Sequence, residues 1–308
     1  MRSRSNVTAR RPITQARSAP PGLLFGATGV LAFSFSLPAT RLAVEGLDPL
    51  FVAFGRAVVA GVLGCAVLLA SRAPRPTPAQ WRSLVLVALG VVVGFPLFTS
   101  LALQRLPAAH GAVVVGLLPA ATAFAAVLRG GERPTRAFWL AGGAGLVAVL
   151  AFALSRGGGA VGLSDGELLA AVVLCAVGYA EGGRLSRVLG GARTICWALV
   201  LSLPVTVAVA AGALAAHGAH ASSTAWLGFA YVSLISMFLG FFAWYAGLAR
   251  GGVAKIGQVQ LAQPVLSLVW AAAILGEAVG AATVAAALAV LACVVATQRT
   301  RVHVAPAD

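Results

Sequence analysis

The sequence predicts an all-α membrane protein in which ten transmembrane helices form two five-helix repeats of inverted topology. Composition gives the first reason, because 60% of the 308 residues are hydrophobic and only 10% are charged, whereas soluble domains carry about 25% charged residues. An internal repeat gives the second reason. The third is the alternation of basic and charge-poor segments along the chain.

The internal repeat is visible in a segment that ends at Glu277 and matches, without a gap, a segment that ends at Glu132. The offset is 145 residues (277 − 132 = 145). Further matched pairs in this register are Arg105 with Arg250, Ala109 with Ala254, Pro119 with Pro264 and Gly131 with Gly276. Because nearly everything around the repeat is apolar, the pattern indicates a duplicated membrane protein, an organisation typical of transporters.

Element boundaries follow because a spanning helix needs about 20 residues, and charges, Pro and Gly cluster where helices end. Residues 1–21 hold five Arg and no acid and are predicted to be a disordered cytoplasmic tail. The apolar run that follows is too long for a signal-peptide core. The first repeat is predicted at residues 22–155, with spans at 22–44, 48–71, 83–104, 107–129 and 136–155.

A Gly-rich linker outside the cytoplasm, residues 156–164, is predicted to join the repeats. The second repeat is predicted at residues 165–298, with spans at 165–184, 192–214, 225–249, 253–275 and 278–298. Residues 299–308 complete the chain as a cytoplasmic tail.

The basic residues separate cleanly between alternate loops. With the N-terminus inside, 18 of the 22 basic residues fall in or beside cytoplasmic segments, whereas Arg41, Arg105 and Arg156 fall outside. Since Lys and Arg are enriched on the cytoplasmic side of membranes, both termini are predicted to be cytoplasmic. Five spans per repeat then make the second repeat enter the membrane upside down relative to the first.

Polar and aromatic side chains at membrane depth are the candidates for holding a small-molecule substrate, because lipid cannot satisfy polar groups. The predicted substrate-binding residues are Phe33, Ser36, Phe98, Tyr179, Trp244, Gln260 and Gln263. In the ninth span the two glutamines share a face with Ser267, where the first repeat has Val115, Leu118 and Thr122. Helix packing and interhelical hydrogen bonds, worth about 1 kcal/mol or less each, are an equally supported interpretation.

Charged residues are predicted inside or at the edge of three spans: Arg56, Glu181 and Lys255. Arg56 lies about 10 Å below the outer surface at 1.5 Å per residue. It is expected either to bond Ser, Thr or backbone acceptors or to lie on the substrate path. Glu181 is near the cytoplasmic side, where Lys255 and Arg184 are alternative partners.

Glycine and proline positions predict where helices pack and bend. Pairs with G-x-x-x-G spacing let backbones approach closely, and they occur at Gly22/Gly26, Gly90/Gly94, Gly178/Gly182 and Gly247/Gly251. Prolines inside spans remove a backbone hydrogen bond and favour kinks, and they are Pro38, Pro96, Pro119, Pro204 and Pro264.

No pattern indicates covalent chemistry, so the chain is not expected to be an enzyme. The four cysteines and four histidines are scattered without metal-ligand or disulfide spacing, and no metal or cofactor is expected. Metalloprotease, P-loop and nucleophile-elbow motifs do not occur, so transport would be secondary or facilitated. The net charge of +14 is explained by membrane topology rather than by a nucleic-acid partner.

The run Pro264–Glu277, echoed by Pro119–Glu132, and the Phe54-Gly-Arg56 element resemble the EamA-type exporters of the drug/metabolite transporter superfamily. The resemblance covers about residues 22–298. It implies a central cavity between the repeats, alternating access, and export of amino acids or related metabolites across a bacterial inner membrane. The first repeat departs from the pattern, since Arg129-Gly-Gly replaces an aliphatic run before Glu132.

The predicted function is therefore a secondary transporter that exports small metabolites, amino acids first among them. A multidrug or cationic-compound exporter is the alternative within transport. A membrane-embedded accessory subunit without flux is the alternative from another class. A central cavity lined by polar and aromatic groups would favour a transporter, and a dry, sealed seam would favour the accessory subunit.

Overall fold

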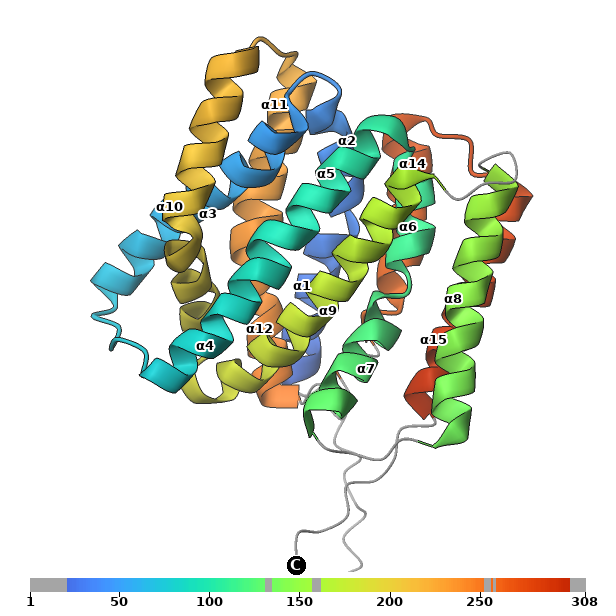
Figure 1. Cartoon of the computed structure of the whole chain (residues 1–308), viewed down its shortest axis with the longest axis horizontal. Helices are drawn as coiled ribbons and strands as arrows, with labels where there is room; N and C mark the ends of the chain where they lie inside the picture. The colour runs from blue at the N-terminus through green and yellow to red at the C-terminus, as the bar shows by residue number, and fades with distance from the viewer. Residues whose placement is uncertain (1–20, 131–134, 157–161, 252–255, 257–258, 300–308) are drawn as a thin grey trace, which may run out of the picture.

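A computed structural model describes residues 21–130, 135–156, 162–251, 256 and 259–299. Their regular secondary structure is entirely helical, and the helices form one bundle (Figure 1). The terminal tails up to residue 20 and from residue 300, most of the predicted linker, Glu132 and Lys255 lie outside the described residues.

The described part of the first half contains nine helical segments that build the first five predicted spans. They are α1 (Pro21–Ser34) and α2 (Ser36–Val44), α3 (Pro49–Ala70), α4 (Pro78–Val87), η1 (Ala88–Gly94) and α5 (Phe95–Arg105), α6 (Ala108–Val115) and α7 (Leu118–Gly130), and α8 (Arg136–Arg156). The segment η1 is a short π-helix within the third span.

The described part of the second half follows the same order. Its segments are α9 (Leu163–Leu189), α10 (Gly191–His217), α11 (Ser223–Ala230), η2 (Tyr231–Leu239) and α12 (Gly240–Gly251), α14 (Ala262–Leu275), and α15 (Ala281–Arg299). The segment η2 is a second π-helix. Shifting η1 by 145 residues gives 233–239, which falls inside η2, so the two π-helices occupy matched positions.

Eight helices of the described chain are long and apolar enough to cross a membrane, and two shorter apolar helices, Ala262–Leu275 and Ala281–Thr297, follow them. The prediction of ten full spans is therefore met by eight full spans and two shorter helices. The third span begins at Pro78, five residues before the predicted start, because Thr77 and Gln80 form a capping box there.

Three helix breaks lie two to four residues before a proline. Continuous helix is interrupted at Phe35 before Pro38, at 116–117 before Pro119, and at 260–261 before Pro264. A proline ring clashes with the carbonyl four residues earlier and leaves it without its helical partner. The predicted kink at Pro204 is not a break, because α10 continues through it.

The two halves interleave rather than lie side by side. Extensive contacts join α3 with α10, α1 with α12, α8 with α15, and α2 with α11, and join α5, α7 and η1 with α9; α6 also packs against α14. Figure 1 shows the α8–α15 pair along one side of the bundle and the α3–α10 pair along the opposite side. Each helix thus packs mainly against a helix of the other half.

Glycines allow the closest of these contacts. A Cβ atom on Gly247 would lie 2.7 Å from the backbone nitrogen of Gly26, and one on Gly90 would lie 2.3 Å from the carbonyl oxygen of Leu174 and 3.1 Å from Gly178. The first contact joins α12 to α1 and the second joins η1 to α9. The G-x-x-x-G prediction of tight seams in these four spans is confirmed.

Candidate functional site

A small enclosed cavity lies at the centre of the bundle, where the irregular backbone segments meet. Its volume is about 20 Å³, roughly the room that one water molecule needs. Helices of both halves line it, and the lining residues are Phe33, Ser36, Arg56, Val91, Phe95, Pro96, Cys175, Tyr179, Ser236, Met237, Phe241 and Gln263. We call this space the central cavity.

Three side chains form a hydrogen-bonded chain across the central cavity. The Arg56 Nη2 atom on α3 donates to the Ser236 Oγ atom on η2 over 2.9 Å, and Ser236 Oγ shares a second bond of 2.7 Å with Ser36 Oγ on α2. All three residues are at most 5% exposed. This row of hydrogen bonds therefore joins the two halves through buried polar groups.

Several buried polar atoms around these three side chains have no hydrogen-bond partner among the described residues. They are Arg56 Nε and Nη1, Gln263 Oε1, Gln260 Nε2, Trp244 Nε1 and Tyr245 Oη, together with the more distant Ser100 Oγ and Trp197 Nε1. A buried polar group without a partner costs free energy. Their concentration near one cavity is therefore typical of a binding site rather than of a passive core.

Aromatic rings form one wall of the site. The ring centroids of Phe33 and Phe241 are 4.8 Å apart, those of Tyr179 and Trp244 are 5.6 Å apart, and those of Phe33 and Trp244 are 6.2 Å apart. Rings at these separations present a broad apolar surface whose faces also attract cations.

A second small space, of about 10 Å³, adjoins the central cavity between α2, α6, α7 and α14. Gln260 and Gln263 line it opposite Val115 and Leu118, their matched residues in the first repeat. The polar side chains of the ninth span thus face the interior of the bundle, and Gln263 borders both spaces.

The structure brings most of the predicted substrate-binding residues together. Phe33, Ser36, Tyr179 and Gln263 line the central cavity, with Trp244 in its aromatic wall and Gln260 in the adjoining space. Phe98 is half-buried and lines neither space. The prediction missed Cys175 and Phe241, although Phe241 could have been found because it lies three residues from Trp244, on the same helical face.

The buried charges have different partners. Arg56 has the Ser acceptor that the sequence predicts, in Ser236. The Glu181 carboxylate pairs with Arg184, one turn further along α9, and Arg184 also donates to the Ser83 hydroxyl over 2.9 Å. The Lys255 alternative lies outside the described residues.

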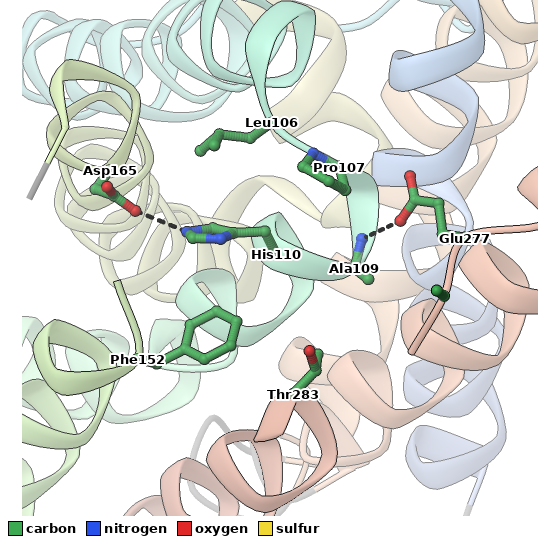
Figure 2. A pocket seen from close by; sticks show the side chains of 9 residues that line it. Leu106, Pro107, Ala109, His110, Phe152, Asp165, Glu277 and Thr283 are labelled. Carbon is green, nitrogen blue, oxygen red and sulfur yellow. Dashed lines mark hydrogen bonds and ion pairs between the residues drawn. The ribbon is translucent and has the colours of Figure 1, made fainter. Parts of the chain in front are cut away.

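A larger cavity, of about 400 Å³, lies near the end of the bundle that carries the connections 106–107 and 276–280. Figure 2 shows the His110 ring turned toward Asp165, with 2.7 Å between Nε2 and Oδ1. Figure 2 also shows the Glu277 carboxylate directed at the start of α6, where it accepts hydrogen bonds from the backbone nitrogens of Ala108 (2.8 Å) and Ala109 (2.7 Å). A carboxylate at a helix N-terminus is favoured by the helix dipole.

We call this end the distal end. The opposite end, with the connection 71–77 and the junction of α9 and α10, is the proximal end (Figure 1). Five of the six described acidic residues are at the distal end: Glu45, Asp48, Asp165, Glu167 and Glu277. All of these except Glu277 pair there with Arg41, Arg105 or the distal histidines. Most described arginines lie instead at the proximal end, at positions 72, 75, 82, 136, 184, 187, 193, 250 and 299.

An apolar multi-span helical bundle with an enclosed polar and aromatic cavity between its halves has the architecture of a membrane transporter. The EamA-like transporter family matches residues 20–154 and again residues 166–297, and the chain belongs to this family. The resemblance to the drug/metabolite transporter superfamily is thereby confirmed.

Two further comparisons agree with the family. A protein of Bacillus subtilis (strain 168), described as the uncharacterized transporter YdeK, is 51% identical over 278 residues, which are 90% of this chain and 97% of that relative. A solved crystal structure with 22% sequence identity matches 92% of this chain and 99% of its own with a TM-score of 0.62, which shows a shared fold.

Proposed function

We propose that this membrane transporter exports small metabolites, amino acids foremost, from the bacterial cytoplasm by alternating access at the central cavity. The observation that carries the proposal is the placement of the central cavity where the broken and π-helical segments of both halves meet. Irregular backbone at membrane depth is tolerated where it is buried in protein or lines a cavity, and substrate sites of secondary transporters form there.

The helix pairing supports two inverted repeats that rock around this site. The α3–α10 and α8–α15 pairs join matched helices of the two halves, and the α6–α14 pair joins the matched fourth and ninth spans. The α1–α12 and α5–α9 pairs are equivalent to each other. A pseudo-two-fold axis in the membrane plane generates this arrangement. The cavity of about 20 Å³ corresponds to an occluded conformation, which widens when the halves separate.

The charge distribution supports a cytoplasmic proximal end. Basic residues gather there and acidic residues gather at the distal end, as expected for a chain whose positive loops remain inside. Export then moves the substrate from the proximal end to the distal end, across the distal contacts of Glu277 and of the His110–Asp165 pair.

The test is export by cells that overproduce the chain. Such cells should grow at higher concentrations of toxic amino-acid analogues than cells with an empty vector, and should release preloaded labelled amino acids faster. No change in growth or efflux for any compound, with the chain present in the membrane, would contradict the proposal and favour an accessory subunit.

Gln263→Leu tests the site within the same assay. Removing the amide that borders the central cavity should raise the half-saturating substrate concentration severalfold or change the substrate range, with membrane insertion unaltered. Gln104→Leu is the matched control, because Gln104 is exposed near the distal end of α5 and should behave like the wild type. Unchanged transport by Gln263→Leu for all compounds would assign the ninth-span glutamines to helix packing.

A further inference from the structure

We propose that Arg56 is the anion site of the central cavity and binds the carboxylate of the substrate, while the aromatic wall holds the substrate's apolar part. This inference rests on the proposed function and adds the chemical class of the exported compound. Neither the family match nor the relatives assign a role to this residue.

Arg56 is a buried cation without a counter-charge at its site. It is 2% exposed, and among the described residues that line the central cavity it alone is charged. Glu181, the described acid nearest the proximal end, is paired with Arg184, and the other described acids lie at the distal end. An unpaired charge inside a membrane protein is costly to retain and by default marks a functional site.

The bonding of the guanidinium leaves donors for a ligand. Nη2 donates to Ser236, whereas the buried Nε and Nη1 atoms have no partner within the described part of the chain. A guanidinium presents its N–H groups in a planar fork that binds a carboxylate through two parallel hydrogen bonds. Nε and Nη1 lie on different edges of the guanidinium, so the second N–H of Nη2 completes the fork together with one of them. Because Ser236 belongs to the second half and is bonded to Ser36, the position of Arg56 is fixed by both halves, so binding at this fork is coupled to their approach.

The remaining groups fit an amphipathic carboxylate. The rings of Phe33, Tyr179 and Phe241 offer apolar surface for a side chain. The unpartnered Gln263 oxygen can accept a hydrogen bond from a substrate ammonium group, and aromatic faces attract the same group. A cationic compound without a carboxylate would instead face an uncompensated guanidinium, which argues against the cationic-compound exporter.

The experiment compares ligands that differ in charge but keep the same apolar body. The full-length purified chain in detergent is heated with L-phenylalanine, 3-phenylpropanoate (carboxylate only), phenylalaninamide (ammonium only) or benzylphosphonate, and apparent affinities are taken from the shift of the unfolding midpoint. L-Leucine, 4-methylpentanoate and leucinamide form a second set. Efflux of the labelled amino acids is measured in parallel.

We expect the carboxylates to stabilise the wild type and the amides to bind at least tenfold more weakly. Arg56→Gln should reduce the affinity for carboxylates at least tenfold and Arg56→Lys should restore part of it. Arg105→Gln, which removes a half-exposed distal arginine, should leave the affinity unchanged.

Equal binding of amides and carboxylates, or full carboxylate affinity in Arg56→Gln, overturns the inference even if the wild type exports amino acids. Stronger binding of benzylphosphonate than of 3-phenylpropanoate overturns the carboxylate assignment. A wild type that neither binds nor exports any of these compounds overturns the proposed function, and the inference with it. Equal binding of the two ligand classes by the wild type overturns the inference even if Arg56→Gln yields no folded protein, and the affinity of Arg56→Lys then tests the assignment to this residue.

Discussion

At the scale of the residue, Ser34 and Ser267 show how a broken membrane helix is stabilised. The carbonyl oxygen of Ser34 is the group that Pro38 displaces from the helical pattern, and it accepts a 2.6 Å hydrogen bond from the Ser267 hydroxyl on α14. The Ser34 hydroxyl in turn accepts a 3.0 Å bond from Trp270 Nε1. In a bilayer no water replaces such partners, so the ninth span stabilises the break in the first span by supplying this hydrogen bond.

Ser267→Ala should therefore destabilise the protein. The substitution leaves a buried carbonyl without its interhelical donor, at a cost of about 1–3 kcal/mol, and should lower the midpoint of thermal unfolding in detergent. Ser202→Ala is the control, because the Ser202 hydroxyl is also buried but bonds only the Ala198 carbonyl of its own helix. Equal midpoints for the two variants would show that the Ser267 bond does not stabilise the break.

The sequence predicted which polar side chains face the interior of the bundle where such a side chain stands out in an apolar span. Ser36 and Gln263 are of this kind, and both line the central cavity. The sequence could not predict that Arg56 keeps two unpartnered nitrogens, because that depends on the distance between the second and eighth spans. The Glu277 contact with the start of α6 was missed for the same reason, since the partners are separated by 168 and 169 positions.

At the scale of the element, the positions of the prolines predicted the helix breaks, whereas the amino-acid composition could not predict the π-helices. The breaks before Pro38, Pro119 and Pro264 follow from steric exclusion of the preceding carbonyl. In contrast, η2 contains no proline and its apolar sequence resembles that of a regular helix. Its irregular hydrogen bonding depends on the packing around the central cavity, which a single span does not encode.

The glycine seams give a prediction at this scale. Gly90→Ala should destabilise the chain by about 1–3 kcal/mol, as overpacking does, because the new methyl group would meet the backbone of α9 rather than a movable side chain. The matched control is Gly143→Ala in α8, where nothing lies within 4 Å of the added atom, and helix propensity should make it neutral or stabilising by about 0.5–1 kcal/mol. The midpoints of thermal unfolding of the two variants in detergent measure this difference in stability. A stable Gly90→Ala protein would mean that the η1–α9 contact is looser than described.

At the scale of the whole molecule, the pairing of helices and the distribution of charged residues both support the proposed organisation as two inverted repeats. Matched helices pack across the two halves, so neither half has a complete set of helix contacts without the other. The sequence predicted the duplication and the alternation of basic loops, because both are patterns along the chain. The predicted ninth span, 253–275, begins partly outside the described residues, and within them α14 begins at Ala262, after a break that apolar composition does not reveal.

The orientation of the bundle in the membrane can be tested with two exposed loop residues. In a version lacking the native cysteines, His220→Cys in the distal connection should react with a membrane-impermeant thiol reagent in intact cells, whereas Ser71→Cys in the proximal connection should react only after permeabilisation. Both positions are exposed, so reactivity reports the side of the membrane rather than burial. The physical reason is the retention of arginine-rich loops in the cytoplasm. The reverse pattern would place the proximal end outside and turn the proposed export into uptake, and labelling of both cysteines in intact cells would contradict an odd number of crossings between them.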